Sequence, residues 1–544
     1  MERAFRPHRM SDPEHNSTSL IEQLHHPGCY PHPVAAVELI ETHISWVLLT
    51  GTYAYKIKKP VNLGFLDFST LEQRRHCCTE ELRLNRRLAP QLYLEVVAIT
   101  GSRKHPRVGG DGPVIEYAVR MRQFPQTALA GALLDAGRLT PRHLEELAAT
   151  LADFHRSAAA GSPDSPYGTP RTILDAALQN FDQLAPLFTA PPDHAALGAL
   201  RRWTQHEFAA RKTLIEQRRN AGAVREGHGD LHLGNIVLID NRLVPFDCIE
   251  FNPELRWTDV IGETAFPVMD LHDRGHPRLA WLFLNAYLER SGDYGGIALL
   301  PFFLVYRAMV RAKIHGLRAT QTGIDSNTRA ALLDTGRTYL RLAETFIRHS
   351  APVLLITHGL SGSGKSRIAG ELMQQHGAIR IRSDIERKRL HGLAPRDRSS
   401  GQIGRGIYDD HATERLYQHL AGLARQIVTS GHSVIIDAAF LRRWQRRLLR
   451  DIAHDAGIPF LIVSVTASGA VLRARIAQRM VADTDPSDAG TDVLEHQLAT
   501  QEPLDGQERA VAVELSNESI STDACCRQAL DTLSTLLQAP KETG

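Results

Sequence analysis

Two segments of the chain have residue types and spacings suited to phosphate chemistry. The first, GLSGSGKS at 359–366, fits the pattern G-x-x-x-x-G-K-[ST]. It follows the apolar segment VLLIT and opens the stretch KSRIAGELMQQH, as a strand–loop–helix unit would. In such a unit backbone N–H groups face phosphate oxygens, the lysine reaches the β- and γ-phosphates, and the last hydroxyl can ligate Mg²⁺. We therefore predict nucleotide binding by Gly359, Leu360, Ser361, Gly362, Ser363, Gly364, Lys365 and Ser366, with Ser366 also a metal ligand.

Charged residues further along the chain could complete this site. Asp384 follows the predicted strand AIRIR and could accept a proton from an attacking hydroxyl, although a helix cap is the alternative. Asp437 ends the apolar segment VIID, where an acidic group can hold Mg²⁺, and capping is again the alternative. Arg475 and Arg479, four residues apart, could bring positive charge over the γ-phosphate or belong to a solvated helix face.

The second segment, HGDLHLGN at 228–235, is followed by VPFDCIEF. In one type of phosphotransfer loop an Asp orients and deprotonates the acceptor hydroxyl, and an Asn five residues later holds Mg²⁺. A further Asp beyond a short hairpin links the metal to the phosphates. Asp230, Asn235 and Asp247 have these types and this spacing, so the sequence predicts a second site that uses ATP and Mg²⁺.

The elements that would position both sites follow from periodicity. HISWVLLTG and TYAYKIKK predict two strands around a turn at Thr50 and Gly51, and LEQRRHCCTEELRLNRRLA predicts a helix. YLEVVAIT and PVIEYAVRMRQF predict two more strands, and helical periodicity follows from Pro141 to about Arg219. Beyond Ala351, apolar strands alternate with helical stretches, which predicts a parallel sheet covered by helices.

The HGDLHLGN segment with its later FD resembles the aminoglycoside phosphotransferase and choline kinase superfamily, relatives of the protein kinases. The resemblance implies a two-lobed α+β kinase-like domain with a phosphate-anchoring lysine. Strand parity with Ala54 favours Lys56 over its neighbours, and the distance to LAP makes Glu81 its ion-pair partner. It also implies structural roles for His155 and for Asp259, the latter as a buried acid that hydrogen-bonds the catalytic loop.

The C-terminal segment resembles the small P-loop kinases: gluconate kinase, the zeta toxins and the 5′-kinase part of phage polynucleotide kinase. This resemblance implies an α/β P-loop NTPase domain. It makes Asp384 the general base, places Asp437 near the metal, and puts Arg475 and Arg479 in a lid.

The order of the two modules resembles a bacterial family labelled bifunctional aminoglycoside phosphotransferase and ATP-binding protein. RLNRRLAP, YKIKKPVNLGFLDFSTLE and DPSDA support this resemblance. We expect a flexible tail over 1–25, a kinase-like domain over 26–350 and a P-loop kinase domain over 351–544. The lobes of the kinase-like domain should meet near 124 and 125.

The composition limits the partners that we expect. With 63 basic and 61 acidic residues the net charge is +2, which gives no general attraction to nucleic acid, so a small-molecule hydroxyl is the expected acceptor. A stripe of arginines between Arg442 and Arg450 keeps a nucleic-acid end as an alternative, and a nucleotide-binding regulator without transfer is another. Because there is neither a signal peptide nor a long apolar run, we expect a cytoplasmic protein with no membrane partner. The sequence does not indicate the oligomeric state.

Overall fold

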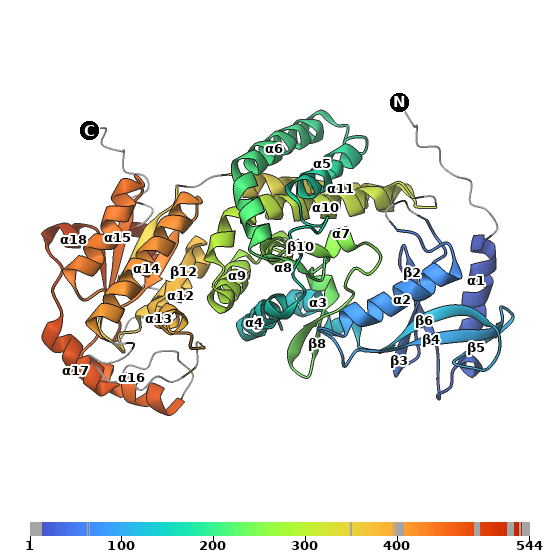
Figure 1. Ribbon diagram of the computed structural model, residues 1–544, viewed down its shortest axis with the longest axis horizontal. Helices are drawn as coiled ribbons and strands as arrows, with labels where there is room; N and C mark the ends of the chain where they lie inside the picture. Colours follow the sequence, from blue (N-terminus) through green and yellow to red (C-terminus); the bar gives the residue numbers. More distant parts are fainter. Residues whose placement is uncertain are drawn as a thin grey trace. The chain divides into compact units, whose positions relative to one another are not determined.

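The structure is a computed structural model that describes residues 13–62, 64, 66–321, 323–348, 351–394, 397, 407, 409–482, 490–518, 527–532 and 535. The chain, drawn in Figure 1, divides into two compact units. Unit 1 comprises Met1–Leu147, Phe154–Thr172 and Glu216–Phe266, and unit 2 comprises Ala148–Asp153, Ile173–Ile215 and Pro267–Gly544. This division differs from a boundary at 351, which stays a prediction.

Unit 1 is built on an antiparallel sheet of six strands. In spatial order the strands are β1 (Glu38–Glu41), β2 (Ser45–Leu49), β3 (Tyr53–Lys58), β6 (Val114–Arg122), β4 (Tyr93–Ser102) and β5 (His105–Val108). The four strands predicted from the sequence are all present, as is the helix α2 (Leu71–Asn85). The two short strands at the edges were not predicted, and β5 contains Pro106, a residue confined in sheets to edges and bulges.

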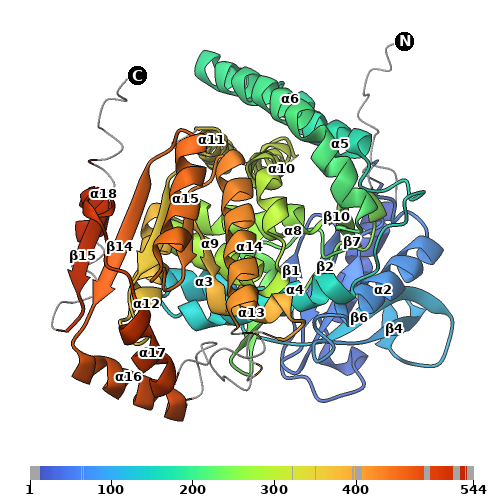
Figure 2. The ribbon, with the colours of Figure 1, turned by 60° about the vertical axis from the view of Figure 1, so that its left-hand side comes forward.

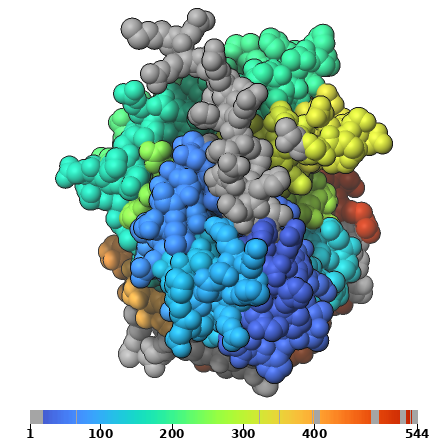
Figure 3. Space-filling view, turned by 90° about the vertical axis from the view of Figure 1, so that its right-hand side faces the viewer, coloured from blue at the N-terminus to red at the C-terminus, as the bar shows by residue number. Residues whose placement is uncertain are grey.

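The first residues that the structure describes form a packed helix. α1 (Pro13–Leu24) buries Leu20, Ile21 and Leu24 in the core formed with β2, β3 and β5. Figure 3 views the molecule from this side, where the blue N-terminal segments form much of the visible surface. Residues 13–24 are therefore not the loose tail expected over 1–25, because STSLIEQL places three apolar side chains on one helix face. Residues 1–12 lie outside the described residues.

The segment after the first sheet supplies short strands and helices. The strands β7 (Val224–Glu226) and β10 (Trp257–Asp259) pair with each other, and β8 (Ile236–Ile239) and β9 (Arg242–Pro245) form the predicted hairpin. The helices are α3 (Ala130–Asp135), α4 (Pro141–Ser157), α5 (Pro170–Leu184), α6 (Pro191–Asn220), α7 (Pro253–Arg256) and α8 (Val260–Asp273). Among the described residues, short 3-10 helices are η1 (Pro27–Cys29), which precedes the first sheet, η2 (Gln126–Ala128), η3 (Leu233–Asn235) and the longer η4 (Tyr294–Leu299).

Unit 2 contains the predicted parallel sheet. Its strand order is β12 (Ile379–Arg382), β13 (Val434–Asp437), β11 (Leu354–His358), β14 (Phe460–Thr466) and β15 (Ala512–Ser516), and neighbouring strands are parallel throughout. Before it come α9 (Pro277–Ser291), α10 (Leu300–Ala319) and α11 (Ser326–Phe346). Between and after its strands lie α12 (Lys365–His376), α13 (Ser383–Leu390), α14 (Asp410–Thr429), α15 (Arg443–Asp455), α16 (Gly469–Ala482), α17 (Thr491–Thr500) and α18 (Gly506–Ala510). Among the described helices of the whole chain, none is both long and apolar enough to cross a membrane.

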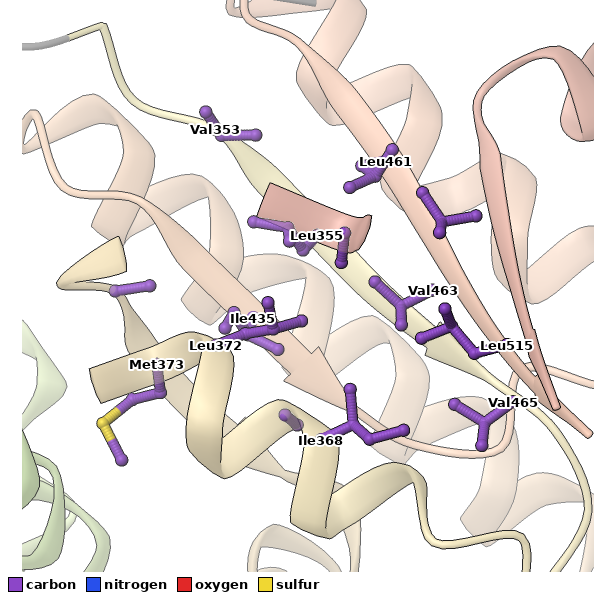
Figure 4. Close-up of a cluster of buried hydrophobic side chains, with 14 of the residues drawn as sticks. Val353, Leu355, Ile368, Leu372, Met373, Ile435, Leu461, Val463, Val465 and Leu515 are labelled. Atoms are coloured by element: carbon purple, nitrogen blue, oxygen red, sulfur yellow. The ribbon is translucent and has the colours of Figure 1, made fainter. Parts of the chain in front are cut away.

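Helices cover both faces of this sheet (Figure 2). α14 and α15 pack on one face, and α12 packs on the other. Figure 4 shows the core under α12, where Leu355 of β11 and Val463 of β14 meet Ile368 and Leu372 of the helix. Leu282 of α9 joins the same core. This packing fixes the carboxyl end of β11, where the glycine-rich loop begins.

The arginines of α15 and its N-cap are engaged by carboxylates and an amide. Arg446, only 1% exposed, pairs with Glu508 at 2.8 Å. The others lie near acceptors on the surface: Arg442 near Glu502, Arg443 near Asp505, Arg447 near Asp451 and Arg450 near Gln507. Arg446 is therefore a structural residue, whereas the side chains of Arg443 and Arg447 are 62% and 71% exposed.

We predict that Arg446→Ala destabilises the sheet of unit 2 while Arg447→Ala does not. Removing Arg446 leaves Glu508 buried without its cation, which costs about 3–5 kcal/mol, whereas the exposed Arg447 pair contributes little. The measurement is hydrogen exchange of the β13 and β14 amides, which gives the free energy of local opening. Equal opening free energies in the two variants would contradict the structural role of Arg446.

Candidate functional site

The candidate site of unit 1 starts from two lysines on one face of β3. Alternation along the strand puts Lys56 and Lys58 on the same side, against Glu81 of α2. Lys56 Nζ lies 2.8 Å from Glu81 Oε1, and Lys58 Nζ lies 2.5 Å from Glu81 Oε2. The predicted pair of Lys56 and Glu81 is thus in contact, with Lys58 as a second cation on the same carboxylate.

Two acids from the loop after β9 complete this ion cluster. Asp247 pairs with Lys56, and Glu250 pairs with Lys58. Lys58 and Glu250 are almost completely buried, while the Asp247 side chain is 40% exposed. Lys58 and Glu250 were not predicted as members of the site. The parity that selected Lys56 also places Lys58 on the same face, and that signal could have found it.

The charges of this cluster follow from its packing. Burial alone would lower the pKa of Lys56, but Asp247 and Glu81 raise it well above its usual value. Partial burial would raise the pKa of Asp247, but the charge of Lys56 outweighs it and lowers that pKa. Burial raises the pKa of Glu250 despite the nearby Lys58. At neutral pH the exposed side of the cluster therefore presents a cationic Lys56 beside an ionised Asp247.

The predicted catalytic loop places Asp230 next to Asn235. The Asn235 side-chain amide donates to Asp230 Oδ2 and to the Asp230 carbonyl, both at 3.0 Å. His232 Nε2 lies 3.4 Å from Asp230 Oδ2, and its Nδ1 accepts from the Gly234 N–H at 3.0 Å. His228 Nε2 contacts the Phe246 carbonyl at 2.8 Å, which ties the loop to the segment that carries Asp247.

A different acid from the expected one braces this loop. Asp259 pairs with Arg218 at 2.8 Å, whereas the backbone N–H of His228 donates to both oxygens of Glu263, at 2.9 and 2.8 Å. Asp259 is buried and structural as expected, but the expected hydrogen bond to the loop is wrong, because Glu263 has that contact. His155 lies 3.3 Å from Glu263, in agreement with a structural role. Burial would raise the pKa of Glu263, but His155 and His228 lower it to about 2.

The residues near Asp247 suit a hard cation. Asp247 has a left-handed backbone, φ 64°, and its N–H donates to the Tyr93 hydroxyl at 3.0 Å. Because the amide nitrogen of Asn235 is bound to Asp230, its amide oxygen is the atom that can coordinate a metal. A carboxylate and an amide oxygen are ligands that Mg²⁺ accepts, so Asn235 and Asp247 fit the predicted ion.

The candidate site of unit 2 is the loop between β11 and α12. Gly364 is the N-cap of α12 with φ 90°, and a Cβ there would lie 2.1 Å from the Asn517 amide nitrogen, so only glycine fits. Lys365 Nζ donates to the Leu360 carbonyl at 3.1 Å. The Ser361 N–H donates to Gln497 Oε1 of α17 at 2.8 Å, a contact that the sequence did not predict.

The two predicted metal ligands of this unit are in contact. The Ser366 hydroxyl donates to Asp437 Oδ1 at 3.0 Å, at the carboxyl ends of neighbouring strands β11 and β13. Asp437 is 4% exposed, and within the described residues its Oδ2 has no hydrogen-bond donor. A buried carboxylate oxygen with unused acceptor capacity beside a hydroxyl fits Mg²⁺. Asp437 ends β13, and α15 has Arg442 as its N-cap, so Asp437 is not a helix cap.

The remaining predicted residues are Asp384, Arg475 and Arg479. Asp384 is half-buried in the first turn of α13, whose N-cap is Arg382, so the capping alternative for Asp384 does not apply. Arg475 donates to the carbonyls of Asn517, at 2.7 Å, and Gly362, at 3.4 Å, so it lies against the loop rather than on a solvated face. Arg479 belongs to α16, but its side chain and the DPSDA segment lie outside the described residues.

Comparison with known proteins gives two family models along the chain. The Phosphotransferase enzyme family matches residues 69–253, and the AAA domain matches residues 354–504. These matches confirm the predicted order of a kinase-like α+β module followed by an α/β P-loop module. Phosphotransfer is the activity that such modules indicate.

Several proteins are similar to the chain over part or most of its length. The uncharacterized proteins Rv2004c of Mycobacterium tuberculosis and Mb2027c of Mycobacterium bovis are each 32% identical over 464 residues, 84% of this chain and 90% of the relative. A gluconokinase structure from Sinorhizobium meliloti is 21% identical, covers 35% of this chain and 95% of its own, and has a TM-score of 0.26. The structure of amicoumacin kinase hAmiN is 14% identical, covers 57% of this chain and 88% of its own, and has a TM-score of 0.35.

We predict that Lys58→Met destabilises unit 1 more than Lys56→Met. Without Lys58 the buried Glu250 loses its cation, at a cost of about 3–5 kcal/mol. Without Lys56, Asp247 can be hydrated and Glu81 keeps Lys58, so the loss should be smaller. Hydrogen exchange of the β3 and α2 amides measures the difference, and a larger loss in Lys56→Met would contradict this division of roles.

Proposed function

We propose that this protein transfers the γ-phosphate of ATP to hydroxyl acceptors at two Mg²⁺-dependent sites. The chain belongs to the family that includes these mycobacterial proteins. One observation carries the proposal. In each unit a carboxylate predicted to bind the metal contacts another predicted nucleotide-binding group, Asp247 with Lys56 and Asp437 with Ser366. These contacts join segments that are 191 and 71 residues apart.

In the N-terminal site, Lys56 faces the phosphates and is held in place by Glu81. Asn235 and Asp247 hold Mg²⁺, which when bound neutralises charge on the phosphates. Asp230 accepts the proton of the acceptor hydroxyl, and its carboxylate is oriented by the Asn235 amide. His228 and Glu263 keep the loop in this position.

In the C-terminal site, the backbone N–H groups of residues 359–366 and the Lys365 ammonium surround the phosphates. Ser366 and Asp437 hold the metal ion, and Asp384 is the base for the acceptor hydroxyl. Arg475 supports the loop backbone beside the nucleotide. Arg479, one helical turn later, is proposed to reach the transferred phosphoryl group from the lid.

A small molecule with a hydroxyl group is the proposed acceptor of both sites. Among the arginines that motivated a nucleic-acid acceptor, Arg446 is buried against Glu508, and the net charge of +2 gives no general attraction to nucleic acid. The segment from 156 to 225 lacks the dense acidic residues that would attract a polycationic aminoglycoside. Since ATP is the proposed phosphate donor, we place the activity in the cytoplasm.

Calorimetric titration of the full chain with AMP-PNP and Mg²⁺ should show two binding sites. Lys365→Ala should remove one of them and leave the other unchanged, because Lys56 and Lys365 lie in separate units. Glu371→Gln, an exposed change on α12, is the matched control and should keep both sites. A single site in the wild type would refute the proposal of two.

Transfer should depend on both proposed bases. The assay uses labelled ATP and a panel of small-molecule alcohols. Asp230→Asn and Asp384→Asn should each lower the rate of transfer to one set of acceptors by at least about 10²-fold. Both variants should still bind the nucleotide. If neither variant alters the phosphorylation of any acceptor, the regulatory alternative becomes the better account.

A further inference from the structure

Helix α9 completes the edge of the parallel sheet in unit 2. Asn285 Nδ2 donates to the Ala378 carbonyl at 3.0 Å, and the Arg380 N–H donates to Asn285 Oδ1 at 2.7 Å. One side chain thus satisfies the edge of β12 much as a neighbouring strand would. Leu282 of α9 is buried in the core under α12, so the helix is fixed in this position.

The same helix presents Glu289, one turn after Asn285, to two arginines of β12. The segment IRIR alternates, so Arg380 and Arg382 lie on one face of the strand. Arg380 lies 3.4 Å from Glu289 Oε2, and Arg382 lies 3.5 Å from Glu289 Oε1. Arg389 of α13 donates to the Glu289 carbonyl at 2.6 Å, which fixes the backbone as well.

Each of these two arginines also approaches one of the proposed metal ligands. Arg380 donates to the Ser366 carbonyl at 3.4 Å. Arg382 Nε lies 4.0 Å from Asp437 Oδ2, the carboxylate oxygen that has no hydrogen-bond donor in the described part of the chain. Glu289 is therefore linked to Ser366 through Arg380 and to Asp437 through Arg382.

We infer that Glu289 is a positioning residue for the C-terminal site, because it holds Arg382 away from the carboxylate that binds Mg²⁺. The inference rests on the proposed function of that site. A guanidinium 4.0 Å from a buried carboxylate can close to a direct ion pair, which would occupy the oxygen needed by the metal. The opposing charge of Glu289 keeps Arg382 at its present distance. Arg382 then supports the site without competing for it.

The position of Glu289 has a consequence for the limits of this site. The residue precedes position 351, so the C-terminal nucleotide site depends on a helix that the sequence assigned to the other domain. A fragment over 351–544 would lack both Glu289 and the Asn285 contact with β12.

The test measures how much Mg²⁺ the full chain needs to bind AMP-PNP at the site that Lys365→Ala removes. Glu289→Gln should raise the half-saturating Mg²⁺ concentration at least about tenfold. This is the lower end of the loss in metal affinity expected when a residue that orients a metal ligand is removed. Nucleotide binding in EDTA should be unchanged. Glu289→Asp, which keeps the charge, should have a smaller effect. Glu371→Gln is the control, because it breaks an exposed 2.6 Å pair with Arg278 between the same helices, α9 and α12.

A second variant separates competition from loss of structure. If Arg382 competes with the metal, adding Arg382→Gln to Glu289→Gln should return the Mg²⁺ requirement toward the wild-type value. A purely structural role of Glu289 would not be rescued in this way. An unchanged Mg²⁺ requirement in Glu289→Gln would overturn the inference alone. If the wild type showed no binding that depends on Lys365, both the inference and the proposed C-terminal site would be overturned.

Discussion

The pairing of buried charges is the constraint on which the candidate site of unit 1 depends. Lys58, Glu81 and Glu250 are almost inaccessible to solvent, and a buried charge without a partner costs several kcal/mol. Strand β3, helix α2 and the loop after β9 can therefore satisfy their charged groups only together. This requirement sets the position of Asp247, which pairs with Lys56 on the exposed side of the cluster. The site is a consequence of how these three segments fold.

In unit 2 the charged groups near the proposed metal ligands are also paired, but there are fewer of them. In its parallel sheet Arg382 of β12 is in register with Asp437 of β13, so a cation and an acid meet at the edge where the glycine-rich loop begins. Ser366 takes one oxygen of Asp437 and leaves the other with acceptor capacity to spare. Glu289 pairs with Arg380 and Arg382. In both units a carboxylate outside the sequence motifs pairs with a cation near a proposed metal ligand. In unit 1 this carboxylate is Glu250, which pairs with Lys58, and in unit 2 it is Glu289, which pairs with Arg382.

Features that depend on local sequence could be predicted. The glycine-rich loop between a strand and a helix and the parallel strands rely on short spacings and strand periodicity, and these elements are found in the structure. The roles of Asp230, Asn235 and Asp247 rely on the same kind of spacing and stay predictions. The Lys56 and Glu81 pair could be predicted because a family resemblance supplied the long-range part of the argument.

Features that depend on tertiary contacts could not be predicted. Glu263 and Asp259 are both acids near the start of α8, and only the fold shows which one reaches the His228 N–H. The charge pattern of α15 gave no sign that Arg446 would be buried against Glu508, 62 residues away. Glu289 and Asn285 lie in a helix with no motif, and their roles come entirely from packing against β12.

The central claim, that one chain carries two phosphotransfer sites, is tested most directly by a crystal structure of the full chain with Mg²⁺ and AMP-PNP. The account predicts two bound nucleotides, one with its phosphates at Lys365 and a metal ion at Ser366 and Asp437. The other should have its phosphates at Lys56 and a metal ion at Asn235 and Asp247. A fully occupied nucleotide at one site, with the ion cluster of the other unchanged at saturating ligand, would contradict it.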